Sequence, residues 1–214
     1  MKYIEIVDLN KTIKDREILK NINLSLDRGK IYGFCGRNGS GKTMLFRAIC
    51  GLIKPTSGVI KIDNKTLHKD MSFPESIGVI IEYPGFWDYY TGYENLKVLA
   101  SIKNIVNDED IKNSLKRVGL DPEDRRTYKK YSLGMKQRLG IAQAIMEKPD
   151  LIILDEPTNA LDEEGIMMVR NLLLEEKTRG ATILIASHNQ QDIEILADDI
   201  YKMQDGKLIT NNIK

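Results

Sequence analysis

The chain contains 214 residues, with 32 Lys and Arg against 31 Asp and Glu, so its formal net charge is +1. This balance excludes the strongly basic surface of a polycationic nucleic-acid binder, and we expect no nucleic-acid partner. The length suits one domain, with or without a subdomain, and is sufficient to bury a sizeable core.

The N-terminal sequence lacks the features of a targeting segment. Residues 1–6 carry charges where a signal peptide would be apolar, and no apolar run approaches the roughly 18 residues of a membrane-spanning helix. We therefore expect a cytoplasmic protein that would need another polypeptide for any membrane-spanning part. The two cysteines, Cys35 and Cys50, fit small buried thiols in a reducing compartment better than a disulfide.

The first predicted elements are strands with alternating apolar residues. Residues 2–8, 16–26 and 59–63 have this pattern, and a turn-forming Pro-Thr-Ser-Gly segment precedes the third of them. Together they predict an antiparallel β-region. Near the other end of the chain, the dipeptide Asp205-Gly206 separates two apolar runs and predicts a hairpin.

Continuous apolar runs predict the buried parallel strands of an α/β fold. These runs are residues 31–35, 77–81, 151–155 and 182–186. The segment between the second and third runs is rich in charge and has helical periodicity. Its predicted helices are residues 93–105, 109–118 and 133–147. We interpret residues 86–147 as a helical subdomain inserted into an α/β core of residues 1–85 and 148–214.

Residues 36–43 match the pattern G-x-x-x-x-G-K-[ST]. In this pattern the glycines let backbone N–H groups point at an anion, Lys42 can reach β- and γ-phosphates, and the Thr43 hydroxyl can ligate Mg²⁺. The pattern follows a predicted strand and precedes a predicted helix over residues 44–50, whose N-terminal dipole favours an anion. The candidate nucleotide-binding residues are Gly36, Arg37, Asn38, Gly39, Ser40, Gly41, Lys42 and Thr43.

Polar side chains follow two of the predicted parallel strands. The strand over residues 151–155 ends in Asp155 and is followed by Glu156. After a phosphate loop, such an aspartate helps to hold Mg²⁺, and the glutamate can act on an attacking water as a general base. His188 follows the next strand and therefore faces the ligand crevice at the carboxyl edge of the sheet. The other histidine, His68, lies in a polar segment and is expected to be a solvated surface residue.

Two predicted helices begin with good N-cap residues. Ser132 precedes the helix over residues 133–147, and its hydroxyl, the free N–H groups and the helix dipole together make a possible second anion site. On these residues alone, an ordinary capped helix is the favoured interpretation. Asp162 is the predicted N-cap of a later helix.

Five segments in order resemble the nucleotide-binding domain of ATP-binding cassette (ABC) proteins. They are the phosphate loop, YSLGM at residues 131–135, LIILDEP, NALD and ASH, and the resemblance covers nearly the whole chain. It implies a P-loop NTPase (RecA-like) core, ATP and Mg²⁺ as cofactors, and two partners. One partner is a transmembrane permease subunit, and the other is a second ABC subunit, either identical or different.

The resemblance also implies roles for particular residues. In that family the signature segment binds the γ-phosphate of ATP held by the other subunit, which assigns this role in trans to Ser132, Leu133, Gly134 and Met135. Asp162 belongs to the loop that couples the two sites of a dimer. The implied catalytic residues are Lys42, Glu82, Glu156 and His188, and the implied metal ligands are Thr43, Glu82 and Asp155.

The sequence departs from the family pattern at three places. The signature, usually LSGGQ, keeps only its serine and second glycine here. Glu82 replaces a glutamine, so it can accept hydrogen bonds from water but lacks an amide donor. Ile13 stands where an aromatic residue usually stacks on adenine. Either Ile13 packs against the base with less stacking energy or the base is held loosely, so the preference for ATP over GTP stays open.

An aromatic stretch at residues 84–96 contains the single tryptophan. Its rings can either cover the core or line an exposed groove, since aromatic residues are enriched in interface cores. In the resembled family this region receives a short cytoplasmic helix of the membrane subunit. We hypothesise that Phe86, Trp87 and Tyr89 contribute to such a groove.

The favoured function is the ATP-hydrolysing subunit of a membrane ABC transporter, working peripherally at the cytoplasmic face of the membrane. Glu82 and the segment TGYENL resemble subunits of peptide or antibiotic exporters. The alternative is a soluble ABC ATPase acting on nucleic acid or ribosomes, which the neutral charge disfavours. A GTPase would need N-K-x-D, and both Asn-Lys-Thr segments lack the aspartate. A small-molecule kinase would leave the signature segment and the Asp-Glu pair unexplained.

Overall fold

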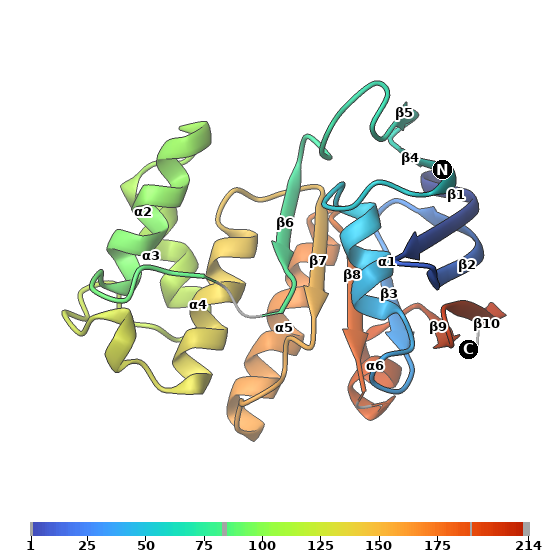
Figure 1. The fold of residues 1–214 in the computed structure, drawn as a ribbon. Coiled ribbons are helices and arrows are strands. Elements are labelled where there is room, and N and C mark those ends of the chain that lie inside the picture. The colour runs from blue at the N-terminus through green and yellow to red at the C-terminus, as the bar shows by residue number, and fades with distance from the viewer. Residues whose placement is uncertain (1, 83–84, 189, 212–214) are drawn as a thin grey trace.

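A computed structural model describes residues 2–82, 85–188 and 190–211. The remaining residues that we expected in the α/β core, namely 1, 83, 84, 189 and 212–214, lie outside the described part. Two β-sheets and the helices around them make up the structure, with a group of helices at one side (Figure 1). The predicted α/β architecture is confirmed.

The smaller sheet is antiparallel, as the alternating strands predicted. Its order is β2-β1-β4-β5, and the strands are β1 (Lys2–Ile13), β2 (Arg16–Asp27), β4 (Ser57–Ile62) and β5 (Lys65–Thr66). The first strand runs well beyond the predicted residues 2–8. Register shifts between Ile6 and Leu9, and again up to Thr12, interrupt the period-two pattern, so the sequence pattern ended before the strand did.

The larger sheet has the order β10-β9-β3-β8-β7-β6. All adjacent pairs in it are parallel except β9 with β10, which form the predicted hairpin. The strands are β3 (Ile31–Cys35), β6 (Ile77–Ile80), β7 (Leu151–Asp155), β8 (Thr182–Ser187), β9 (Asp199–Gln204) and β10 (Lys207–Asn211). The four predicted parallel strands are therefore all present, and each end agrees to within one residue.

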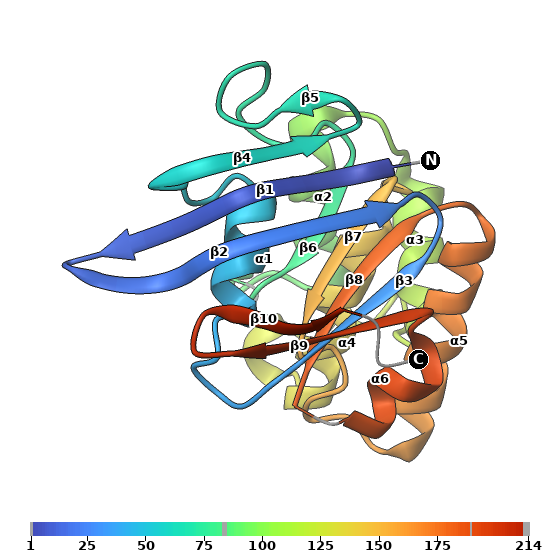
Figure 2. The ribbon, with the colours of Figure 1, turned by 90° about the vertical axis from the view of Figure 1, so that its right-hand side faces the viewer.

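Strand β7 shows how the large sheet separates two hydrophobic cores. Leu151 and Ile153 face the core that contains α1 (Lys42–Ile49) and the inner side of the small sheet. Ile152 and Leu154 face the other core, because successive side chains of a strand point to opposite faces. Helix α1 accordingly lies between the two sheets (Figure 2).

The opposite face of the large sheet is covered by α4 (Leu133–Ile145), α5 (Glu163–Thr178) and α6 (Gln190–Leu196). Helix α4 approaches β6 closely, since a Cβ built on Gly78 would lie 1.7 Å from the carbonyl oxygen of Ala144. Only glycine fits there. This contact fixes α4, and with it Ser132 at its N-cap, relative to the sheet.

The predicted helices of residues 86–147 are present as α2 (Gly92–Lys103), α3 (Asp108–Arg117) and α4, with a 3₁₀ turn η1 (Tyr128–Lys130) before the last. Thr91 and Asn107 form capping boxes at the starts of α2 and α3. These helices gather at one side of the sheet (Figure 1). Their buried side chains nevertheless join the same hydrophobic core as β7 and α5.

The expectation for His68 is wrong, whereas the expected burial of both cysteine thiols is confirmed. His68 is only partly exposed, and its Nε2 is buried with no hydrogen-bond partner among the described residues. His68 lies in a tight turn, in which its N–H donates to Met71 O at 2.7 Å, whereas Lys65, Lys69 and Asp70 of the same polar segment are exposed. Cys35 and Cys50 are free and buried, and burial raises the pKa of the Cys50 thiol to about 12.

Candidate nucleotide site

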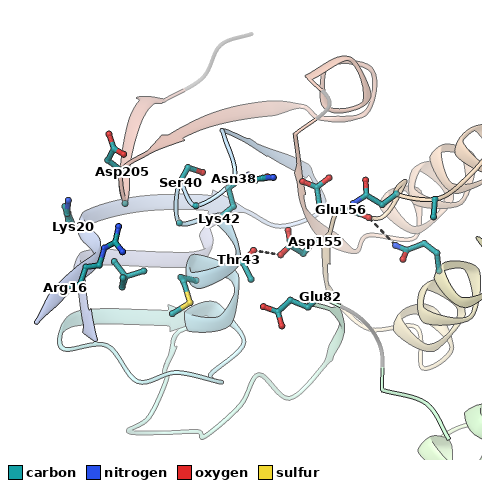
Figure 3. Close-up of a pocket in the computed structure, with 18 of the residues that line it drawn as sticks. Arg16, Lys20, Asn38, Ser40, Lys42, Thr43, Glu82, Asp155, Glu156 and Asp205 are labelled. Carbon is teal, nitrogen blue, oxygen red and sulfur yellow. Dashed lines mark hydrogen bonds between the residues drawn. The ribbon is translucent and has the colours of Figure 1, made fainter. Parts of the chain in front are cut away.

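A cavity of about 890 Å³ lies at the carboxyl edge of the large sheet (Figure 3). Four parts of the chain meet in its wall: the phosphate loop, the end of β7, the start of β2 and the start of α4. Residues at the β9–β10 turn, Glu82, Tyr128 and residues 159–160 also line it. The carboxyl edge of a parallel sheet is where ligands bind in α/β folds, so the cavity is the candidate site.

The loop before α1 has the backbone shape that its glycines predict. Gly36 and Gly41 have φ angles of 156° and 108°. A side chain at Gly36 would also collide with the chain opposite, since its Cβ would lie 2.3 Å from Met203 O. Because β3 is fully buried up to Cys35, the loop leaves the sheet at a fixed position. Lys42 therefore lies in the first turn of α1.

Two polar side chains in this loop are buried, and neither has a charged partner among the described residues. The Lys42 ammonium donates to Gly36 O at 2.8 Å and Arg37 O at 3.4 Å, although Lys42 is only 6% exposed. The Ser40 hydroxyl is buried and has no hydrogen-bond partner in the described part of the chain. Buried donors of this kind are costly unless satisfied. An anion in the loop would satisfy both, so these residues fit a phosphate group.

Thr43 and Asp155 meet in the floor of the cavity. The Thr43 hydroxyl donates to Asp155 Oδ2 at 2.5 Å. Burial raises the pKa of the Asp155 carboxyl, an effect that the Thr43 hydrogen bond partly offsets and the neighbouring Glu156 charge reinforces. A hydroxyl and a carboxylate are oxygen ligands suited to Mg²⁺, and a cation would relieve the desolvated charge. The pair therefore fits the expected magnesium site.

Glu156 is held in place by the residues that follow β8. The backbone N–H of His188 donates to Glu156 Oε1 at 2.9 Å, and His188 Nδ1 lies 2.8 Å from Oε2. The Glu156 backbone has φ = 54° and its N–H donates to Ala186 O at 2.8 Å. His188 thus lies beside the predicted catalytic carboxylate and is not among the residues that line the cavity.

Glu82 lines the cavity but is engaged elsewhere. Its carboxylate pairs with Arg47 of α1 at 2.8 Å, and its side chain is 59% exposed. The described residues contain no group of three or more His, Cys, Asp or Glu side chains placed to hold a metal ion. The metal and catalytic roles of Glu82 therefore remain predictions, with Arg47 as the competing partner.

The start of α4 reaches the far wall of the same cavity. Ser132 caps the helix by accepting a hydrogen bond from the Met135 N–H at 3.2 Å, as predicted. Leu133 is 66% exposed and lines the cavity, whereas Ser132, Gly134 and Met135 do not. Asp162 caps α5 through Gly165 at 3.0 Å, again as predicted.

The sequence pattern does not predict the residues of β2 that line the cavity. Arg16 and Lys20 lie in its wall, and neither makes an ion pair within the described residues. Ile13, which pairs with Arg16 across the β1–β2 hairpin, does not line the cavity. The missing signal was the contact of β2 with the β9–β10 turn, where the Lys20 N–H donates to Gly206 O at 2.8 Å.

A phosphate loop between a buried strand and a helix, with a Thr-Asp pair and a positioned glutamate, defines a P-loop nucleotide-binding protein. Residues 19–159 match the family model described as "ABC transporter". The chain therefore belongs to the ABC transporter family, and it is an ATP-binding, ATP-hydrolysing domain of that family. Among the described residues, no helix is both long and apolar enough to cross a bilayer.

Relatives match over nearly the whole chain. The ABC transporter ATP-binding protein YybJ of Bacillus subtilis is 52% identical over 97% of this chain and 95% of its own length. The bacitracin transport ATP-binding protein BcrA of Enterococcus faecalis is 42% identical, and the match covers 98% of this chain and 69% of the length of BcrA. The lantibiotic transport ATP-binding protein SrtF of Streptococcus pyogenes is 40% identical, and the match covers 96% of this chain and 89% of the length of SrtF.

A solved structure agrees with the fold. The dimeric structure of MJ0796, a bacterial ABC transporter cassette, superposes with a TM-score of 0.89 at 26% identity. The match covers 99% of both chains. The expected fold class and family are confirmed.

Arg16→Ala is expected to weaken ATP binding several-fold, because the cavity loses a cation that can attract phosphate or stack on a base. The measurement is the dissociation constant for ATP by titration calorimetry at two salt concentrations. Lys14→Ala is the control, since Lys14 is exposed on the same hairpin and does not line the cavity. Equal affinities for the two variants would contradict a role for Arg16.

Proposed function

We propose that this chain is the subunit that powers a membrane exporter of peptide antibiotics. Two relatives that match nearly all of it are named for transport of bacitracin and of a lantibiotic. These names favour transport over the alternative of a soluble ATPase acting on nucleic acid. The chain would work peripherally at the cytoplasmic face of the membrane, together with a permease subunit.

The observation that carries the ATPase assignment is the set of groups around the cavity floor. Thr43 and Asp155 would hold Mg²⁺, which supplies charge neutralisation for the transferred phosphoryl group when bound. Lys42 and the loop N–H groups bind phosphate oxygens, and Ser40 offers a further donor. Glu156, fixed by His188, orients and deprotonates water at the edge of this site.

The second half of the site comes from another copy of the chain. Ser132 satisfies one N–H at the start of α4, while the helix dipole and the other N–H groups remain available to an anion. The exposure of Leu133 at this helix start is expected of a surface that a second subunit covers. ATP would then be held between the phosphate loop of one copy and residues 132–135 of the other.

Mixing two inactive variants tests this arrangement. Ser132→Arg should abolish hydrolysis by blocking closure, and Lys42→Ala should abolish it by removing the phosphate-binding ammonium. A mixed dimer contains one intact site, built from the loop of the first variant and the signature of the second. We expect the mixture to hydrolyse ATP, measured as phosphate release, when neither variant does so alone.

Single-site binding provides the control for the mixing experiment. Ser132→Arg should bind ATP with nearly the affinity of the unchanged protein, because Ser132 does not line the cavity of its own chain. An inactive mixture of two correctly folded variants would contradict the proposal that the two halves come from different copies.

The loop before α2 is the proposed contact with the permease. Trp87 and Tyr89 are 47% and 78% exposed, and Asn95 holds the loop by bonding to both the N–H and the carbonyl of Trp87 at 2.8 and 3.1 Å. Phe86 instead packs edge-on against Tyr128, with ring centroids 5.2 Å apart. Phe86 therefore anchors the loop, and Trp87 and Tyr89 present aromatic surface to a partner.

Trp87→Ala should leave hydrolysis by the isolated chain unchanged and reduce its recovery with permease-containing membranes several-fold, because a large apolar contact is lost. The measurement is cosedimentation of the purified chain with membrane vesicles that contain the permease. Phe73→Ala is the matched control, since Phe73 is 57% exposed and lies outside this loop. Equal recovery of both variants would overturn the proposed docking surface.

A further inference from the structure

Gln137, in the second turn of α4, contacts the backbone next to the catalytic carboxylate. Its side-chain amide donates to Glu156 O at 3.2 Å and to Pro157 O at 3.1 Å. The residue is partly buried and lines the cavity. A single amide NH₂ thus holds two consecutive carbonyl groups immediately after β7.

The Glu156 backbone needs such an anchor. A φ of 54° is unfavourable for a residue with a side chain and persists only where surrounding contacts enforce it. The Glu156 N–H is held by Ala186 O at 2.8 Å on the β8 side. Gln137 holds the carbonyl on the other side. The direction in which the Glu156 carboxylate leaves the chain therefore depends on a side chain from α4.

Two more contacts join the start of α4 to the segment that follows Glu156. A Cβ built on Gly134 would lie 3.0 Å from Ala160 O, so the backbones approach closely there. Arg138 Nη2 lies 3.3 Å from Asp162 Oδ1. Together with Gln137, these contacts connect the first two turns of α4 to residues 156–162 at both ends of that segment.

We propose that Gln137 is a positioning residue for ATP hydrolysis. Its two hydrogen bonds fix the backbone conformation of Glu156. When the N-terminal end of α4 at Ser132 moves, Gln137 therefore moves the Glu156 carboxylate of the same chain. In the dimer proposed above, on which this inference rests, α4 of one chain meets the nucleotide bound by the other. Binding at one nucleotide would thus be transmitted through Gln137 to the water-activating group at the second.

A double-mutant cycle tests the proposal. Gln137→Met keeps the length of the side chain and removes both hydrogen bonds. We expect kcat to fall roughly ten-fold, with the ATP affinity and KM unchanged, because the lost contacts act on Glu156 and not on the phosphate loop. In a Glu156→Gln background the same change should slow the residual hydrolysis much less, since the carboxylate to be positioned is absent.

The control is Gln143→Met, in the same helix, because Gln143 makes no side-chain hydrogen bond among the described residues. It should leave kcat unchanged in both backgrounds. An unchanged kcat in Gln137→Met, or equal slowing in the two backgrounds, would overturn the positioning role. Failure of the dimer model would show separately, as loss of activity in the mixture of the Ser132 and Lys42 variants.

Discussion

Ionisable groups buried at the carboxyl edge of the large sheet constrain the rest of the site. Lys42 is 6% exposed and Asp155 is 8% exposed, and each is delivered there by a fully buried strand. A buried charge is tolerated only where partners satisfy it. In this chain the partners are loop carbonyls for Lys42 and the Thr43 hydroxyl for Asp155. Lys42 can still bind an anion, and Asp155 with Thr43 can still bind a cation beside it.

The packing around this edge explains why distant segments contribute to one site. The β9–β10 turn bonds both to the phosphate loop, through Gly206 N to Ser40 O at 2.9 Å, and to β2. The contact of Gly78 with α4 fixes the helix whose start faces the cavity. ATP binding can therefore act on the small sheet, the large sheet and the helices of residues 86–147 at once.

Features of the fold that depend on a local signal follow from the sequence. The buried strands, the phosphate loop and the caps Ser132 and Asp162 depend on neighbouring residues, and the structure contains them as predicted. The C-terminal end of β1 was missed because register shifts break its alternation. His68 was misjudged because a turn closed by several hydrogen bonds, among them His68 N–H to Met71 O and Asp70 N–H to Thr66 O, leaves it only partly exposed.

Contacts between segments far apart in the chain could not be predicted in this way. Arg16 enters the cavity only because β2 lies against the β9–β10 turn, and the ion pair of Glu82 with Arg47 depends on how α1 meets β6. In the sequence Gln137 is an ordinary polar residue of a predicted helix, and its two carbonyl partners are known only from the structure. The fold and most of the phosphate site thus follow from sequence, whereas the connections among its parts require the structure.

The most direct test of the account is the oligomeric state of the Glu156→Gln variant. That substitution removes the charge that we propose activates water, and it leaves the phosphate loop and the Thr43–Asp155 pair intact. Sedimentation velocity with and without Mg²⁺ and ATP would measure whether two copies close on the nucleotide. We expect a monomer without ATP and a stable dimer with it. A monomer under both conditions, in a variant that still binds ATP, would contradict the proposed dimer.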